Sequence, residues 1–160
     1  MRRSSIIGEG IVVGVAGAAA VAIWFLIADL MAGVPFRTPA LLGSALLHGL
    51  RDPAALQVTV PVVAEYTLVH GLAFIVFGIA AAGLFALVDQ DRRVLFAVFM
   101  LFCCFEVFFV ALVMILSERL FEEMSVVTIL GANLLASIVM LGILFRRHHR
   151  APRELLAVGE

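Results

Sequence analysis

Long apolar stretches are the feature that most constrains this chain. Four of them, at about residues 6–31, 61–88, 94–116 and 124–145, contain few charged residues. Each is long enough to cross a bilayer, which needs about 20 mostly apolar residues. Backbone polar groups in hydrocarbon must be hydrogen-bonded within their own segment, so each stretch is predicted to be a helix. No segment alternates between polar and apolar residues as the strands of a membrane barrel do, and the predicted fold class is all-α.

The composition and the connections extend this prediction. Of the 160 residues, 64% are hydrophobic and 14% are charged, whereas soluble domains are about 45–50% apolar and about 25% charged. Little chain remains outside the four stretches, so residues 1–160 are predicted to form a single transmembrane domain. The short links "DQDRR" and "SERLFEEM" predict that the second, third and fourth spans are antiparallel neighbours. The predicted architecture is an integral membrane antiparallel four-helix bundle.

The arginines predict the orientation of the bundle, because every one of the 11 basic residues is an arginine. Eight of them belong to one side of the membrane: Arg2, Arg3, Arg92, Arg93, Arg146, Arg147, Arg150 and Arg153. Only Arg37, Arg51 and Arg119 belong to the other side. By the positive-inside rule, both termini are cytoplasmic.

Residues 146–160 are predicted to be a basic cytoplasmic tail. Arg146, Arg147 and Arg150 follow the last span directly, where arginines can contact anionic lipid headgroups.

The connection between the first two spans contains helix signals of its own. Thr38 before Pro39 is typical of a helix start, with the threonine as N-cap and the proline in the first turn. Gly49 is a predicted helix end, and Asp52 before Pro53 indicates a second short start. Apolar residues recur at helical spacing: Leu41, Leu42, Ala45 and Leu46. The connection therefore predicts a short amphipathic helix on the outer face of the membrane.

Small residues form a ridge on the first span at four-residue spacing: Gly10, Gly14, Ala18 and Ala22. Such small-xxx-small ridges let membrane helices approach closely. The ridge predicts helix packing, either within the molecule or across a dimer.

A layer of polar residues is predicted halfway through the membrane. His70, Glu106 and Asn133 each lie about nine or ten residues below the outer end of their span, at about 15 Å depth. A charge exposed to lipid there costs about 2.5–3.5 kcal/mol, so these side chains are predicted to face inward and contact one another. Tyr66 and Ser137 lie within one turn of this layer on the same faces, and the five residues form a predicted polar cluster.

The cluster is interpreted first as a clamp between helices. Polar contacts between membrane helices contribute about 0.6 kcal/mol on average, which is enough to set their register. In this interpretation the protein is a structural or accessory subunit of a homo-oligomer or larger membrane complex. Its partners are the lipid bilayer and other membrane subunits or itself, with no nucleic acid and no cofactor.

Three alternatives remain open from the sequence. His70 and Glu106, joined by His48, offer ligands for haem or a metal, although the usual pair of Glu-x-x-His motifs is missing. An acid and a histidine in a membrane also mark paths for protons or small solutes, but no polar residues continue the path to either side. An enzyme acting on lipid would use Asp29, Glu65, Tyr66 or His48, which form no recognisable motif.

Three stretches carry a resemblance: "WFLIADLMAGVPFRTPALLGSAL", "YTLVHGLAFIVFG" and "FEVFF". In them the chain resembles small four-span proteins of the bacterial inner membrane, and the similarity covers most of the chain. The resemblance implies a multi-pass protein of that membrane. It implies no activity, ligand or catalytic residue.

Overall fold

The computed structural model describes residues 3–88, 94–116 and 125–156, and within these ranges it contains helices and no strand. The α-helices are α1 (Arg3–Met31), α2 (Arg37–His48), α3 (Val60–Val88), α4 (Val94–Leu116) and α6 (Val126–Leu156), and a 3-10 helix, η1, covers Pro53–Ala55. The all-α prediction is confirmed. The side chains of Glu106 and of residues 148–156 lie outside the described part.

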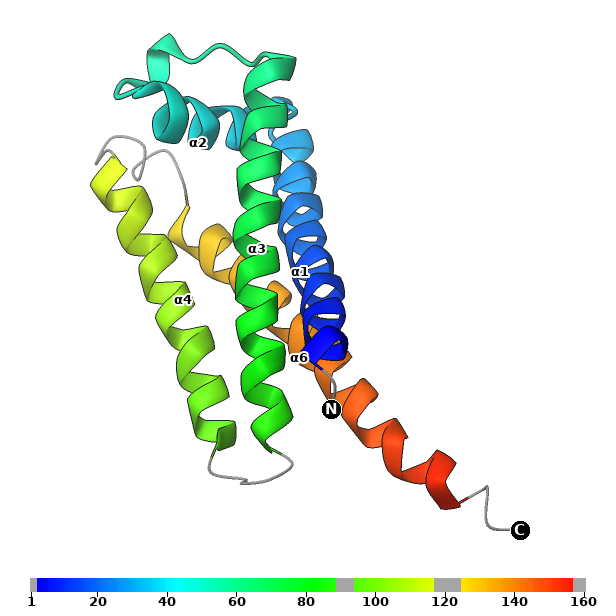
Figure 1. Cartoon of the computed structure of the whole chain (residues 1–160). Coiled ribbons are helices and arrows are strands. Elements are labelled where there is room, and N and C mark those ends of the chain that lie inside the picture. Colours follow the sequence, from blue (N-terminus) through cyan, green and yellow to red (C-terminus); the bar gives the residue numbers. More distant parts are fainter. Residues whose placement is uncertain (1–2, 89–93, 117–124, 157–160) are drawn as a thin grey trace.

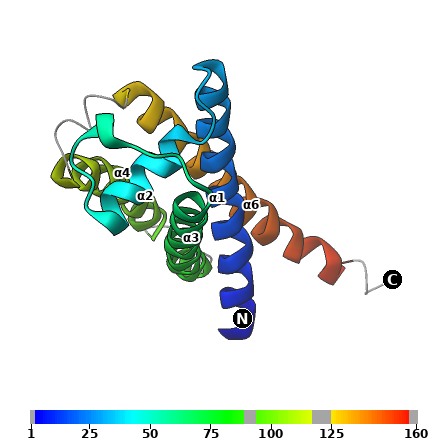
Figure 2. The same ribbon diagram turned by 90° about the horizontal axis from the view of Figure 1, so that it is seen from above.

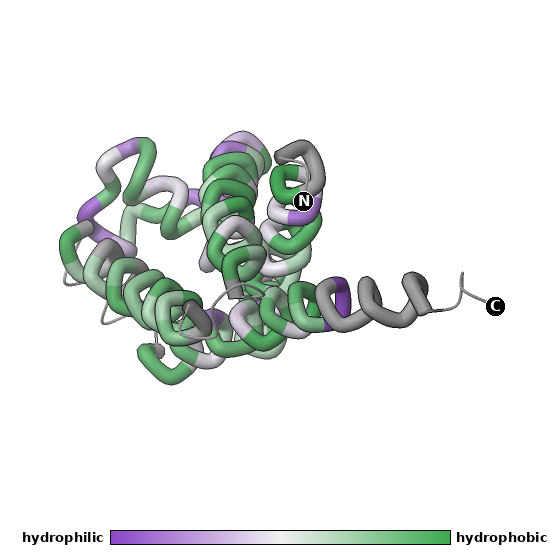
Figure 3. The backbone as a smooth tube through the Cα atoms, turned by 60° about the horizontal axis from the view of Figure 1, so that its bottom comes forward, coloured by the Kyte–Doolittle hydropathy of each residue, from purple (hydrophilic) through white to green (hydrophobic). Residues whose placement is uncertain are grey.

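Three helices are long and apolar enough to cross a membrane: Ile6–Met31 in α1, Val60–Leu87 in α3 and Val126–Arg147 in α6. Only 33%, 33% and 28% of their most apolar windows are buried, so most of their apolar surface faces outward, where lipid can solvate it. Figure 3 shows hydrophobic residues along the helices and hydrophilic ones mainly toward their ends and in the connections. In α4, the described residues provide a shorter apolar stretch, Phe96–Phe105. The fourth span and the four-helix bundle therefore stay predictions.

The long helices pack around α1 and α3, which lie side by side along most of their length (Figure 1). Helix α6 crosses α1 obliquely, α4 packs mainly against α3, and α2 lies across one end of α3. Seen from above, α2 covers this end of the molecule, while the last turns of α6 project away from the other helices (Figure 2).

Glycines bring the backbones of α1 and α3 together. A Cβ atom on Gly14 would lie 2.3 Å from the carbonyl oxygen of Phe74, and a Cβ on Gly78 would lie 2.3 Å from the carbonyl oxygen of Gly10. A Cβ on Gly10 would lie 2.4 Å from the Cα of Ile79. Only glycine permits backbones this close. Early residues of α1 thus meet late residues of α3, and the two chain directions oppose each other here.

Aromatic side chains join α3 to α4. Phe77 on α3 packs between Phe102 and Phe105 of α4, with ring centroids 5.1 and 4.2 Å away. Phe74 meets Phe105 edge-on at 5.4 Å. Such pairs contribute about 0.5–1.5 kcal/mol each beyond the area that they bury, so this cluster accounts for much of the attachment of α4.

The connection between α1 and α3 forms the predicted short helix, although its start differs from the prediction. Helix α2 begins at Arg37, after Phe36 in a left-handed conformation with φ 62°. Thr38 is therefore inside the first turn and is not the N-cap. The other signals are confirmed: Gly49 ends the helix at φ 70°, and the Asp52 side chain accepts a hydrogen bond from the backbone N–H of Ala54 at the start of η1.

Helix α6 differs most from its predicted bounds. It starts at Val126 and continues to Leu156, so the helix includes much of the segment predicted as a tail. Its buried face packs against α1, where the side chain of Met140 lies over Gly17. The run of arginines does not end the helix, because arginine is a good helix former.

Candidate functional site between α1, α2 and α3

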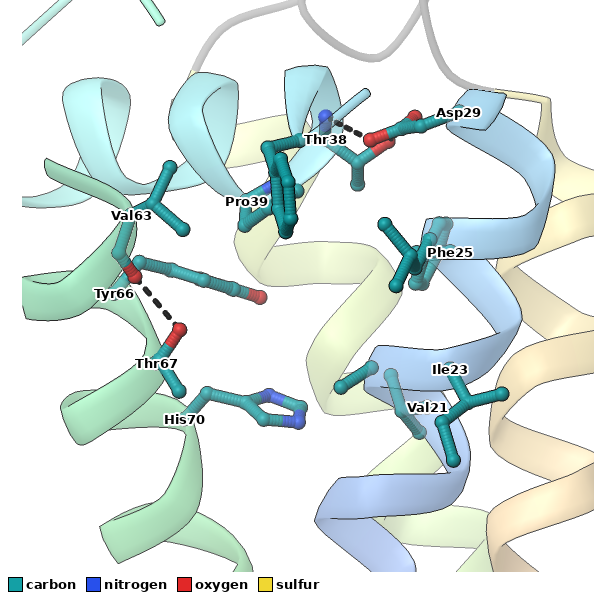
Figure 4. Close-up of a pocket in the computed structure, with 13 residues that line it drawn as sticks. Val21, Ile23, Phe25, Asp29, Thr38, Pro39, Val63, Tyr66, Thr67 and His70 are labelled. Carbon is teal, nitrogen blue, oxygen red and sulfur yellow. Dashed lines mark hydrogen bonds between the residues drawn. The ribbon is translucent and has the colours of Figure 1, made fainter. Parts of the chain in front are cut away.

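A partly enclosed cavity of about 190 Å³ lies where α1, α2 and α3 meet (Figure 4). The backbones of α1 and α3 touch at Gly14 and Gly78, and the cavity lies nearer the end of the pair that α2 covers. Apolar residues of all three helices form most of its wall, among them Val21, Phe25 and Leu26 of α1, Pro39 of α2 and Val63 of α3. The site is therefore an apolar pocket with a small number of polar groups, as ligand pockets in proteins generally are.

Asp29 and Thr38 form the polar upper edge of the cavity. The Oδ1 atom of Asp29 accepts a hydrogen bond of 2.7 Å from the Thr38 hydroxyl, and its Oδ2 atom accepts one of 2.8 Å from the Thr38 backbone N–H. A carboxylate that accepts from the first turn of a helix satisfies an otherwise unpaired N–H and complements the helix dipole. Asp29 is 6% exposed, so this contact attaches α2 to the end of α1.

Tyr66 and His70 form the wall on α3, and both rings point across the cavity toward α1 (Figure 4). The two rings stack with centroids 5.7 Å apart, and His70 packs on Phe74 at 4.7 Å. No hydrogen bond between the lining residues involves the Tyr66 hydroxyl. The Nε2 atom of His70 lies 3.3 Å from the carbonyl oxygen of Ala18 on α1.

This last contact determines which nitrogen of His70 carries the proton. A carbonyl oxygen only accepts, so Nε2 carries the hydrogen and donates it to Ala18. In the neutral ring, Nδ1 is then unprotonated and can accept a hydrogen bond. The cavity wall thus presents a hydroxyl donor from Tyr66 and a nitrogen acceptor from His70.

The cavity has a mouth between α1 and α3. Three exposed lining residues mark it: Ala22 and Ile23 on α1 and Thr67 on α3; a fourth exposed lining residue, Phe36, lies beside α2. Thr67 donates its hydroxyl hydrogen to the carbonyl oxygen of Val63, in the preceding turn of its own helix, and so offers little polarity at the rim.

The predicted polar cluster has no support from the described residues. His70 contacts Ala18 and aromatic rings, whereas the Nδ2 atom of Asn133 is buried and has no hydrogen-bond partner among the described residues. Ser137 is half-buried one turn away on α6. The side chain of Glu106, the central member, lies outside the described part. Of the four members whose side chains the structure describes, Tyr66 and His70 stack on one another.

His48 has a different partner from those predicted. Its Nε2 atom lies 2.8 Å from an oxygen of Glu65, and both side chains are about half exposed, at 51% and 48%. This pair links the end of α2 to α3. Among the side chains that the structure describes, no three of His, Cys, Asp and Glu gather closely enough to hold a metal ion.

The remaining predicted site residues occupy two regions. On the ridge of α1, Gly10 and Gly14 face α3 of the same chain, Ala18 is buried and Ala22 is exposed at the cavity mouth. On α6, Arg146 and Arg147 are exposed. The side chain of Arg150 lies outside the described residues.

One link between helices was not foreseen from the sequence. The indole Nε1 atom of Trp24 donates a hydrogen bond of 3.1 Å to the backbone carbonyl of Thr128, and the ring lies against Gly131. Two features of the sequence could have indicated this link. The single tryptophan lies near one end of the first apolar stretch, and Gly131 lies near one end of the fourth. Nothing in the residue spacing showed that they face each other.

No protein-family model, curated protein or solved structure matches this chain. The chain is an all-helical protein with three helices long and apolar enough to span a membrane.

Proposed function

We propose that this chain is a structural or accessory protein of the bacterial inner membrane, working as a subunit of a homo-oligomer or of a larger membrane complex. One observation carries the proposal: polar side chains of the described residues connect one helix to another. The contacts are Trp24 with Thr128, His70 with Ala18, Asp29 with Thr38 and His48 with Glu65.

Each of these four contacts joins two helices. They connect α1 with α6, α3 with α1, α1 with α2 and α2 with α3. In an apolar solvent, hydrophobic burial does not hold helices together, so packing and polar contacts must do so. Polar residues arranged in this way support a scaffold whose role is to present a stable outer surface to lipid and to neighbouring subunits.

The position in the membrane is part of the proposal. The arginine distribution supports cytoplasmic termini, and α2 would then cover the outer end of the bundle. Exposed Arg146 and Arg147, near the end of the apolar part of α6, are at the position where arginines contact anionic headgroups.

The deciding experiment is extraction of the full chain from its native membrane with a polymer that retains surrounding lipid. We expect the chain to elute in a complex larger than its 17.2 kDa mass, with a second copy or a fixed ratio of another membrane protein identified by mass spectrometry. A lone chain in lipid, at its native expression level, would contradict the subunit role. Crosslinking in intact cells before extraction guards against loss of a weak partner.

A further inference from the structure

We propose that the cavity between α1, α2 and α3 binds a lipid-soluble molecule with a single hydroxylated aromatic ring, of the phenol or hydroquinone class. The inference requires that α1 and α3 cross the membrane but does not depend on the accessory role. Three features support it: the size of the cavity, the position of its mouth and the polar atoms on its wall.

The volume restricts the occupant to one ring. Sites for drug-sized ligands measure about 300–1,000 Å³, whereas an apolar cavity of about 150 Å³ accepts benzene. At about 190 Å³, this cavity has room for one substituted ring. Because it is only partly enclosed, a chain attached to the ring can leave through the mouth.

The mouth indicates where the occupant comes from. Ile23 lies eight residues from the end of α1 at Met31, and Thr67 lies seven residues from the start of α3 at Val60. At about 1.5 Å per residue, both are about 10–12 Å along their helices. That depth is within the hydrocarbon core, which is about 30 Å thick, so a molecule entering here arrives from the lipid.

The polar atoms select a hydroxyl group on the ring. Tyr66 offers a hydroxyl hydrogen that no other lining residue uses, and His70 offers Nδ1, because Nε2 already donates to Ala18. In Figure 4 the second nitrogen of the imidazole is on the side that faces Tyr66. A phenolic hydroxyl both donates and accepts, so a single such group can satisfy both residues.

The aromatic wall favours a ring over an acyl chain. Tyr66 and His70 stack on α3 and line the cavity together with Phe25 of α1 and Phe36. Phe74, which does not line the cavity, packs on His70 in a tilted geometry. Aromatic rings attract one another in offset and edge-to-face geometries beyond their buried area. Phe36 reaches its place only through a left-handed backbone, a conformation that costs about 1–2 kcal/mol. Residues held in such conformations cluster at ligand sites.

The test is calorimetric titration of the detergent-purified full chain with two probes. One is a 1,4-hydroquinone with a short alkyl tail, and the other is its dimethyl ether, which keeps the ring but cannot donate a hydrogen bond. We expect the hydroquinone to bind and the ether to bind at least tenfold more weakly. Equal affinities would overturn the proposal, because the cavity would then accept any apolar ring.

Variants locate the binding. Ala22→Leu extends a side chain across the mouth and should abolish binding, whereas Ala19→Leu, also exposed on α1 but not lining the cavity, should leave it unchanged. Tyr66→Phe should weaken hydroquinone binding about three- to tenfold, as expected for one neutral hydrogen bond. The ether oxygens can also accept from the Tyr66 hydroxyl, so the weaker binding of the ether should fall as well. Ser137→Ala removes a hydroxyl outside the cavity and should change neither probe. Full affinity in Ala22→Leu, with thermal unfolding as in the wild type, would overturn the site.

Discussion

The carboxylate of Asp29 holds Thr38 through two hydrogen bonds, one to its hydroxyl at 2.7 Å and one to its backbone N–H at 2.8 Å. Asp29 belongs to the last turn of α1 and Thr38 to the first turn of α2. The contact therefore places α2 across the end of the long helices and forms the roof of the cavity. It also stabilises a chain reversal that contains Phe36 at φ 62°.

Asp29→Asn should destabilise the protein. An asparagine can still accept from the Thr38 backbone N–H, and the Thr38 hydroxyl can turn to accept from its NH₂ group. Both hydrogen bonds then lose their charged acceptor, and a neutral bond contributes about 0.5–1.5 kcal/mol where a charged one contributes about 1.5–3. Thermal and denaturant unfolding in detergent measure the change. Asp52→Asn is the matched control, because Asp52 is exposed and asparagine caps helices as well as aspartate does. Equal losses in the two variants would contradict the role of Asp29.

Gly78→Ala should separate α1 from α3. The added Cβ would lie 2.3 Å from the Gly10 carbonyl oxygen and 2.8 Å from the Gly14 Cα, and backbone atoms cannot move aside cheaply. Overpacking of this kind costs about 1–3 kcal/mol, measured as a lower unfolding midpoint. Gly71→Ala on the same helix meets nothing within 4 Å and should be neutral or slightly stabilising, since alanine is the better helix former. A stable Gly78→Ala variant would show that the helices pack elsewhere.

Trp24→Phe should weaken the attachment of α6. It removes the indole donor to the Thr128 carbonyl and part of the ring surface on Gly131, and polar contacts between membrane helices average about 0.6 kcal/mol with a maximum of about 1.7. The loss is read from chemical denaturation in detergent, followed by circular dichroism. Thr128→Val provides the control, because the acceptor is the backbone oxygen and survives the change. If Thr128→Val lost as much stability, the hydrogen bond would not be the cause.

Phe77→Leu should loosen α4. The leucine lacks the ring contacts with Phe102 and Phe105, and two such pairs contribute about 1–3 kcal/mol together. Crosslinking between cysteines introduced on the facing sides of α3 and α4 measures the separation, in a background without the native cysteines. Phe96→Leu, at a side chain 69% exposed, should leave the crosslinking yield unchanged. Unchanged yield in both variants would mean that other contacts hold α4.

Reporter fusions test the proposed orientation. A fluorescent protein that folds only in the cytoplasm should be active after residue 160, and alkaline phosphatase, which needs an oxidising compartment, should be active when inserted at η1. Phosphatase after residue 160 is the control and should be inactive. The reverse pattern would place the arginine-rich side outside and contradict the positive-inside argument.

The helices could be predicted from the sequence because their signals are local. The predicted stretches at residues 61–88 and 94–116 differ from α3 and α4 by no more than one residue, since a membrane helix needs only length, apolarity and its own backbone hydrogen bonds. The roles of Gly49 at the end of α2 and of Asp52 at the start of η1 could also be predicted, because each residue acts on its immediate neighbours. The start of α2 was misplaced because the group that binds Thr38 is Asp29, on another helix.

The candidate site was only partly predictable, for a related reason. His70 and Tyr66 stand out in the sequence as polar residues in an apolar stretch, but their depth does not show which groups they contact. The Nε2 atom of His70 contacts a backbone carbonyl of α1, and a search for polar side chains cannot find a backbone partner.

The helices and the segments that suit lipid could be recognised from the residues alone, because each segment forms its own backbone hydrogen bonds and its own side chains contact the hydrocarbon. The packed structure was needed to show that Gly14 lies against Phe74, that His70 turns toward Ala18 and that Asp29 closes a cavity beneath α2. Those contacts depend on how each helix is rotated and crossed against the next. The rotation and crossing angle of each helix result from the packing of all the helices together. They cannot be predicted from the spacing of residues along one helix.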